Sequence, residues 1–543
     1  MRQCGILMPV SSLPGPGGIG CFGKQAYAFV DFLNRAGQQL WQILPLSPTG
    51  YGDSPYQSCS AFAGNPYLID LETLVDEGLL ESTDITKWDW GEDATRVDYG
   101  KLYNSRFVVL RKAYRAFLEK CHGVHGMEQY LPDDWYAFTL KNENWLPDYA
   151  LYMAGKKAFK MQSWQQWPEE LRDREPEALK EFAEENADEV GFWTFLQYEF
   201  DKQWTALKQY ANQKDVRILG DMPIYAAADS ADAWTGGKLF ERNEDGSFAR
   251  VAGCPPDFFS ATGQLWGNPV YDWEYHRQTG FAWWVQRMRR SLELYDVVRI
   301  DHFRGFDTYW AIPAGSETAI NGKWEKGPGM ELFRAMEAAI GHPLPIVAED
   351  LGELFDSVRE LLRESSYPGM KVLQFGFGGG NEFLPYNYTR NTVVYPGTHD
   401  NTTLTDWWEN AASEQEKNFA RVYLNLKSDE DAVPALLDAV LSSVSDTAIV
   451  PMFDWLGLGG EARLNYPGRT DGNWSWRMLD GAATDALAYH IRSRCWVYGR
   501  TSAPAEVPQV QSKPQQEPQK APAEQKQSTL RTGKQKKHKK HKR

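Results

Sequence analysis

Eight short apolar segments, each bounded by turn residues, divide most of the chain into a regular series. They are Gly5 to Val10, Leu40 to Leu46, Val216 to Tyr225, Val297 to Phe303, Pro345 to Glu349, Lys371 to Phe375, Thr392 to Tyr395 and Ala448 to Phe453. Short runs that are apolar throughout are typical of strands buried on both faces, as they are in parallel sheets. We therefore predict eight parallel strands.

Helical patterns accompany most of these strands. Lys24 to Arg35 follows the first strand, and Met330 to Ile340 precedes the fifth. Repeated strand-then-helix units favour parallel pairing, and eight of them indicate a closed barrel. The predicted fold class is α/β, a (β/α)8 TIM barrel with inserted, mostly helical subdomains.

The interval between the second and third strands breaks this rhythm. It is rich in charge and in helical patterns, for example at Ser105 to Lys120 and Glu177 to Asn186. We expect residues 68–200 to form an inserted helical subdomain beside the C-terminal rim of the barrel. Residues 1–67 and 201–500 then form the catalytic barrel itself, with rim insertions.

The composition changes after residue 500. Residues 501–543 contain five Pro, many Gln and Lys and no aromatic residue, and they carry 11 Lys and Arg against 3 Asp and Glu, a formal charge of +8. Such a segment buries too little apolar surface to offset the entropy lost on ordering, so we predict a disordered basic tail. The preceding 500 residues carry 47 Lys and Arg against 70 Asp and Glu, a formal charge of −23.

These properties narrow the class of protein. An acidic body is a poor partner for nucleic acid or anionic membranes, because both favour a basic face. No run of 18 apolar residues predicts a transmembrane helix, the N-terminus lacks the features of a signal peptide, and the six Cys include no CxxC pair. We expect a cytoplasmic enzyme or binding protein. The basic tail could recruit nucleic acid or another anionic partner, but a solvated tail is the simpler interpretation.

Candidate chemistry follows from the predicted barrel. Active sites of parallel barrels lie at the C-terminal ends of strands, and Asp301, Glu349 and Asp400 come at the ends of the fourth, fifth and seventh predicted strands. Alternation along a strand places Arg299 on the same face as Asp301, where its cation favours the ionised carboxylate. Glu349 follows an apolar strand, which could hold its carboxyl group protonated.

One ionised and one protonated carboxyl group, with a third negative group nearby, is the set that glycosidic bond chemistry uses. The 22 Trp, 26 Tyr and 26 Phe offer flat apolar faces for sugar rings, although packing explains most individual Trp residues. A structural ion-pair role for the three carboxylates stays open on spacing alone.

Two other interpretations compete. Gly15 to Gly20 matches the GxGxxG pattern of dinucleotide-binding loops after a strand, but Pro16 removes an amide donor and the second strand ends without an acid for a ribose hydroxyl. The three carboxylates could instead hold Mg²⁺, an interpretation that the neighbouring Arg299 opposes.

Motifs spread over residues 5–500 carry a resemblance to a known family. They are SSLPGPGGIG (11–20), GYGDSPYQS (50–58), SAFAGNPYLIDL (60–71), GDMPIY (220–225), GCPPDFFSATGQLWGNP (253–269), RIDHFRGF (299–306), AEDLG (348–352), PGMKVLQF (368–375), GTHDN (397–401), and RLNYPG with GNWSWR (463–468 and 472–477). The chain resembles the amylomaltases, which are the 4-α-glucanotransferases or disproportionating enzymes of glycoside hydrolase family 77.

The resemblance implies a barrel with inserted subdomains that transfers segments of α-1,4-glucans with retention and needs no metal or other cofactor. It implies Asp301 as the nucleophile, Glu349 as the general acid/base and Asp400 as the group that stabilises the transition state. The substrate-binding residues that it implies are Arg299, His302, His399 and Asp221 at the cleavage point, Tyr56, Gln264, Trp266 and Asn465 at neighbouring subsites, and Tyr51 at a secondary glucan contact. An α-glucan hydrolase and a non-catalytic glucan-binding protein on the same fold are the alternatives. The chain departs from the family pattern at Gly378 and Tyr386, on the acceptor side.

Overall fold

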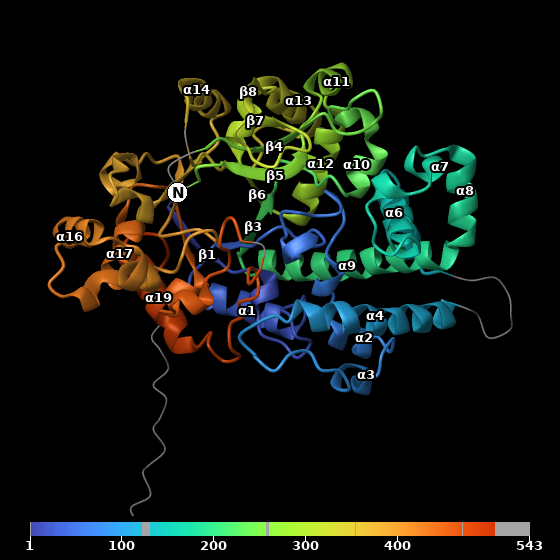
Figure 1. Ribbon diagram of the computed structural model, residues 1–543. Coiled ribbons are helices and arrows are strands. Elements are labelled where there is room, and N and C mark those ends of the chain that lie inside the picture. Colours follow the sequence, from blue (N-terminus) through green and yellow to red (C-terminus); the bar gives the residue numbers. More distant parts are fainter. Residues whose placement is uncertain (1, 122–130, 257–259, 353, 470, 505–543) are drawn as a thin grey trace, which may run out of the picture. The chain divides into compact units, whose positions relative to one another are not determined.

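The structure is a computed structural model that describes residues 2–121, 131–256, 260–352, 354–469 and 471–504 (Figure 1). Of the tail that the sequence predicts to be disordered, residues 505–543 lie outside the described part of the chain. The described residues share one extensive hydrophobic core.

Eight parallel strands follow one another around a barrel in chain order. They are β1 (Gln3–Leu7), β2 (Leu40–Gln42), β3 (Arg217–Met222), β6 (Val297–Ile300), β9 (Ile346–Ala348), β10 (Gly369–Val372), β11 (Thr392–Tyr395) and β12 (Thr447–Pro451). The hydrogen-bonded ladder runs from β10 through β11, β12, β1, β2, β3 and β6 to β9. All eight predicted strands are present, most of them shorter than the apolar runs that predicted them, and the predicted α/β barrel is confirmed.

Single hydrogen bonds connect β9 to β10 and close the barrel. The backbone N–H of Ala348 donates to the carbonyl of Pro368 at 2.9 Å. The backbone N–H of Met370 donates to Oδ1 of the Asp350 side chain at 2.6 Å. A side chain thus takes the place of a strand partner at the closing point, directly beside Glu349.

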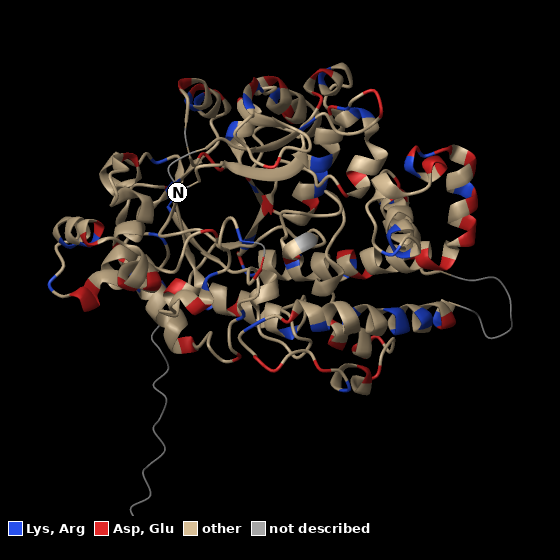
Figure 2. Ribbon diagram, in the orientation of Figure 1, with Lys and Arg blue, Asp and Glu red and all other residues tan. Residues whose placement is uncertain are grey.

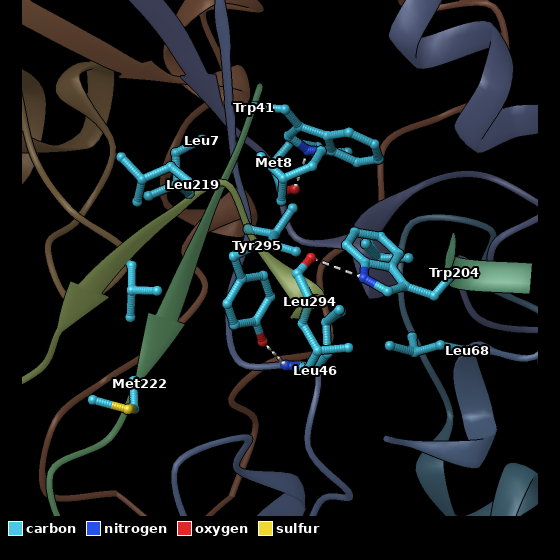
Figure 3. Close-up of a cluster of buried hydrophobic side chains, with 14 of the residues drawn as sticks. Leu7, Met8, Trp41, Leu46, Leu68, Trp204, Leu219, Met222, Leu294 and Tyr295 are labelled. Atoms are coloured by element: carbon cyan, nitrogen blue, oxygen red, sulfur yellow. Dashed lines mark hydrogen bonds between the residues drawn. The ribbon is translucent and has the colours of Figure 1, made fainter. Parts of the chain in front are cut away.

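Large aromatic side chains with satisfied polar tips pack in the core (Figure 3). The indole of Trp41 donates to the carbonyl of Met8 at 2.8 Å, and the hydroxyl of Tyr295 accepts the backbone N–H of Leu46 at 3.1 Å. Such rings stabilise the fold because their apolar area leaves water while the polar tip keeps a partner. Gly220 faces the ring of Tyr295, where a Cβ atom would come within 2.1 Å, so no larger residue fits there.

Helices connect the strands on the outside of the barrel. They include α1 (Lys24–Arg35), α10 (Ala231–Thr235), α11 (Trp273–Gln278), α12 (Ala282–Leu294), α13 (Met330–Ile340), α14 (Asp356–Ser365), α15 (Leu404–Asp406), α16 (Glu414–Tyr423), α17 (Ala432–Ser442), α18 (Met452–Trp455) and α19 (Asp485–Val497). The helices α1 and α13 have the bounds that the sequence predicted. Figure 2 shows that charged residues gather on outer helices and are sparse on the barrel strands. Among the described residues, no helix has both the length and the apolar character needed to cross a membrane.

The region between β2 and β3 is mostly helical where the structure describes it. Its helices are α2 (Leu71–Asp76), α3 (Ser82–Thr86), α4 (Tyr99–Cys121), α5 (Asp133–Lys141), α6 (Leu146–Ala158), α7 (Glu169–Arg172), α8 (Pro176–Glu185) and α9 (Ala187–Gln213). The helices α4 and α9 lie side by side (Figure 1), with the rings of Phe117 and Phe195 5.2 Å apart. Residue 200, where the sequence suggested a domain boundary, falls inside α9.

A second sheet, antiparallel and four-stranded, was not predicted. Its strands are β4 (Arg250–Cys254), β5 (Gln264–Pro269), β7 (Thr308–Pro313) and β8 (Lys323–Lys326), in the order β5-β4-β7-β8. They belong to the connections between β3 and β6 and between β6 and β9. The strands β5 and β8 are mostly exposed or half-buried, so no continuous apolar run marks them in the sequence.

Candidate active site

The three predicted carboxylates lie beyond the C-terminal ends of three barrel strands. Asp301 directly follows β6, Glu349 directly follows β9, and Asp400 lies five residues after β11. Glu349 is buried, whereas the side chains of Asp301 and Asp400 remain 29% and 45% exposed. The carboxylates therefore lie at the end of the barrel where parallel barrels carry their active sites, and two of them are accessible to a ligand.

Arg299 connects two carboxylates inside the barrel. Its Nη1 lies 2.8 and 2.7 Å from the two carboxylate oxygens of Asp221, and its Nη2 lies 3.0 Å from Oδ1 of Asp301. Asp221 and Arg299 are direct neighbours in the register of β3 and β6. The contact with Asp301 agrees with the strand alternation that placed both side chains on one face.

Burial and Arg299 act on Asp301 in opposite directions. Removal from water raises the pKa of Asp301, Arg299 lowers it, and the charges of Asp221 and Asp400 raise it again. The net result is a pKa above the ordinary aspartate value. The neighbouring cation therefore favours the ionised form, as the sequence suggested, but does not by itself set the pKa.

Glu349 accepts two backbone hydrogen bonds. The N–H of His302 donates to Oε2 at 2.7 Å, and the N–H of Leu351 donates to Oε1 at 2.8 Å. His302 has a φ of 52°, in the left-handed region that few residues other than glycine adopt. Burial raises the pKa of Glu349, Arg299 lowers it, and the charge of Asp301 raises it further. The net shift is upward, in the direction that keeps this carboxyl group protonated near neutral pH.

Asp400 has fixed polar partners on both carboxylate oxygens. The side-chain amide of Asn465 donates to Oδ1 at 2.7 Å, and Nε2 of His399 lies 3.3 Å from Oδ2. Partial removal from water acts to raise the pKa of Asp400, but His399 and Asn465 hold it well below its usual range. Burial lowers and Asp400 raises the pKa of His399, and the net shift is upward. Asp400 thus carries a negative charge at neutral pH.

Tyr56 connects Asp221, which pairs with Arg299, to His399, which lies beside Asp400. Its hydroxyl donates to Oδ2 of Asp221 at 2.8 Å and lies 2.9 Å from Nε2 of His399, whose ring stacks on the tyrosine with centroids 5.2 Å apart. Trp474, to which no role was given from the sequence, packs against both rings at 5.6 and 6.0 Å. Its place in the GNWSWR motif was the only available signal.

The remaining predicted residues extend the site toward the second sheet. Trp266 on β5 meets the ring of His302 edge-on, with centroids 4.9 Å apart, and its indole donates to the side chain of Gln264 at 3.1 Å. The side chain of Tyr51 lies outside what the structure describes. Every predicted site residue except Tyr51 therefore contacts another predicted site residue or interacts with its charge.

The site consists of carboxyl groups around the buried cation of Arg299. Among the residues that the structure describes, no three His, Cys, Asp or Glu side chains form a group that could hold a metal ion. The pKa of Glu349 is raised, Asp301 is paired with the cation of Arg299, and Asp400 stays ionised. Fold and site together define a barrel enzyme that acts on glycosidic bonds.

Similarity to known proteins defines the family. The family model described as 4-alpha-glucanotransferase, glycoside hydrolase family 77, matches residues 8–482. The 4-alpha-glucanotransferase of Clostridium butyricum is 47% identical over 497 residues, which are 91% of this chain and 100% of that protein, and the one of Thermus thermophilus is 46% identical over 504 residues, 91% and 98%. The solved amylomaltase of Streptococcus agalactiae, in complex with acarbose, is 40% identical with a TM-score of 0.87 and covers 92% of this chain and 100% of its own. The chain belongs to the 4-alpha-glucanotransferase family, which confirms the resemblance seen in the motifs.

Proposed function

We propose that this enzyme transfers a segment of a 1,4-α-D-glucan to the 4-hydroxyl of an acceptor glucan or of glucose by double displacement with retention. The observation that supports this mechanism best is the pair Asp301 and Glu349, one carboxyl group beside Arg299 and the other buried with a raised pKa. Retaining enzymes need one carboxylate that attacks and one carboxylic acid that donates a proton.

In the first step Asp301 attacks the anomeric carbon of the donor glucan. The bond from that carbon to the glycosidic oxygen breaks, and Glu349 gives its proton to the departing oxygen. A β-linked glucosyl-enzyme results. The ionised Asp400 favours the positive charge that develops on the sugar ring, since opposite charges attract strongly where water is excluded.

In the second step the 4-hydroxyl of an acceptor attacks the same carbon from the side that the first product left. Glu349, now ionised, takes the hydroxyl proton, and the carboxylate of Asp301 leaves. Two inversions restore the α configuration. Glu349 ends the cycle protonated, ready for the next donor.

Transfer exceeds hydrolysis only when an acceptor sugar outcompetes water for the glucosyl-enzyme. We assign this role to the aromatic wall around Trp266 and Gln264 on β5, which lies against His302. Arg299, Asp221, Tyr56, His399 and Asn465 form the polar wall that would bind sugar hydroxyls. The amylomaltase of Streptococcus agalactiae binds acarbose in its solved complex, which supports maltooligosaccharides and amylose as the partners of this chain.

Incubation with maltotriose tests the proposal. A transferase produces a ladder of longer maltodextrins together with glucose, whereas a hydrolase produces only shorter sugars. A glucan-binding protein without activity leaves maltotriose intact. Exhaustive chelation should leave the ladder unchanged, since no metal takes part in the proposed steps.

We also propose a cytoplasmic location. Cys4, Cys21, Cys59, Cys121 and Cys495 are free thiols, of which Cys59 is half-buried and the other four are buried. Thiols without disulfides are typical of proteins that work in a reducing compartment. Recovery of the native protein mainly from the secreted fraction of its cells would contradict this assignment.

A further inference from the structure

Asp454 is a buried carboxyl group near the active site that the mechanism above does not use. It lies in α18, directly after β12, and is 3% exposed. Its Oδ1 accepts the backbone N–H of Leu404 at 2.7 Å. Within the described part of the chain, Oδ2 has no hydrogen-bond partner. Among the residues that the structure describes, the one hydrogen bond of this side chain is therefore the bond to Leu404.

Leu404 stands where the segment that carries His399 and Asp400 ends and α15 begins. The side chain of Thr403 caps this helix by accepting the N–H of Asp406. The first N–H groups of a helix find no partner within it and must be satisfied from elsewhere. At Leu404 that partner is Asp454 of α18, so the hydrogen bond ties the segment to the helix that directly follows the barrel strand β12.

Side chains from other elements hold the same segment upstream of Leu404. Gln374, after β10, donates to the carbonyl of Thr402 at 3.0 Å. Arg463 donates to the carbonyl of Asp400 at 3.0 Å. These two side chains are donors to backbone carbonyls, whereas Asp454 supplies an acceptor to a backbone N–H. Asp400 is thus fixed at its own carbonyl and at two points within four residues after it.

Burial raises the pKa of Asp454 to about 8, so the carboxyl group is uncharged at neutral pH. An uncharged carboxyl group is far less costly to bury than a carboxylate. What Leu404 requires is an acceptor oxygen at this place. A side-chain amide offers the same oxygen, and an alkyl side chain of similar size does not.

We propose that Asp454 is a positioning residue for Asp400: its carboxyl oxygen holds the N–H of Leu404 and thereby fixes the segment that presents Asp400 and His399 to the sugar. The proposal rests on the role proposed for Asp400. A shift of about 1 Å in a catalytic group slows a reaction on the order of 10²-fold, so a small displacement of this segment is enough to be measured.

Two variants whose side chains have the same number of heavy atoms test whether an acceptor oxygen is required at this position. Asp454→Asn keeps the oxygen, and we expect kcat for maltotriose transfer to stay within about threefold of the wild type. Asp454→Leu leaves the N–H of Leu404 unpaired, and we expect kcat to fall about 10- to 100-fold. We expect KM to change less than about threefold in either variant, because the interaction lost acts mainly in the transition state.

A control variant separates this effect from a general loss of stability. Val30→Ala truncates a fully buried side chain of α1, which packs on α9 and α19. We expect this variant to lower Tm without lowering kcat at a temperature where it is folded. If Asp454→Leu has a Tm similar to that of the control variant but a lower kcat, the loss of activity comes from lost positioning and not from lost stability.

Several results would overturn the proposal. One such result is a kcat in Asp454→Leu equal to that of the wild type. Another is a decrease of kcat in Asp454→Asn as large as the decrease in Asp454→Leu. If Asp454→Leu does not fold, Leu404→Pro removes the donor instead, at a helix position that accepts proline, and an unchanged kcat there overturns the proposal as well. Absence of the maltodextrin ladder in the wild type, or full activity in Asp400→Asn, contradicts the proposed function and is seen without any Asp454 variant.

Discussion

Nη2 of Arg299, on β6, lies 3.0 Å from Oδ1 of Asp301, the residue that directly follows this strand. The guanidinium group is almost fully buried, so water screens this pair less than a surface ion pair. Burial alone would favour a neutral Asp301, and the cation opposes that tendency. The negative charge required of an attacking carboxylate therefore depends on a residue that the barrel interior holds in place.

Asp301→Asn removes the proposed nucleophile with almost no change in shape. We expect transfer from maltotriose to fall by at least about 10³-fold, while circular dichroism and Tm stay close to the wild type. The exposed Asp480→Asn is the matched control and should keep full activity. Wild-type transfer by Asp301→Asn would remove Asp301 from the mechanism.

The pH dependence of kcat/KM tests the pair of carboxyl groups. Activity should rise as Asp301 ionises and fall as Glu349 loses its proton, and both limbs should lie above the ordinary carboxyl range because burial raises both pKa values. Glu349→Gln has no proton to lose, so its residual activity should lack the alkaline limb. An alkaline limb that persists unchanged in this variant would assign the limb to another group.

An activated donor separates proton donation from attack. An aryl α-maltoside has a leaving group that departs without protonation, so formation of the glucosyl-enzyme should be nearly normal in Glu349→Gln. With maltotriose the same variant should lose about 10²- to 10⁴-fold. Equal losses with both donors would argue that Glu349 has a structural role only.

Tyr56→Phe removes one hydroxyl that contacts both Asp221 and His399 while keeping the ring that stacks on His399. We expect kcat/KM to fall about tenfold, the effect of one net hydrogen bond of roughly 1 to 1.5 kcal/mol. Tyr136→Phe on α5 is the control, because Tyr136 is 53% exposed and its hydroxyl has no described role in the site. The contact is irrelevant to catalysis if both variants behave alike.

Arg500 stabilises the far end of the barrel. Its buried guanidinium donates to five backbone carbonyls, among them those of Gln3 at 3.0 Å and Leu441 at 2.7 Å. Arg500→Ala removes these five hydrogen bonds, although Arg2 still donates to the carbonyls of Leu441 and Ser443, and we expect the free energy of unfolding to fall by about 3 kcal/mol. Arg363→Ala, at an exposed ion pair, should change it by less than about 1 kcal/mol. Urea denaturation of both variants measures the difference.

The pH dependence of the free energy of unfolding tests whether Asp454 is uncharged in the folded protein. Its pKa is raised to about 8 in the folded state, from about 3.9 in an unfolded chain. The folded state therefore binds one proton more between these values, and its stability decreases as pH rises from about 4 to about 8, by up to about 1.4 kcal/mol per pH unit. Asp454→Asn removes this dependence, so its stability relative to the wild type should grow with pH. A constant difference would show that Asp454 is ionised in the folded protein.

The barrel strands could be predicted because burial on both faces favours apolar residues at most positions. The second sheet could not, because β5 and β8 leave much of their surface exposed and no periodic pattern distinguishes them from loops. The helix that begins at Ala187 also crosses the boundary that charge and composition suggested at residue 200. Because α9 packs both on the helices between β2 and β3 and on the barrel, the composition of the chain does not change at the point where one region ends and the other begins.

The sequence by itself determined the barrel, the family and the residues proposed to carry the chemistry, because strand ends and motifs are local features of a chain. Only the tertiary structure decided how these residues act on one another. The bond between Asp454 and Leu404 joins residues 50 positions apart, and Trp474 meets Tyr56 across more than 400. The pKa of Asp301 likewise depends on burial, which many distant residues produce together. Contacts of this kind have no local pattern in the sequence, and they arise only when the barrel closes.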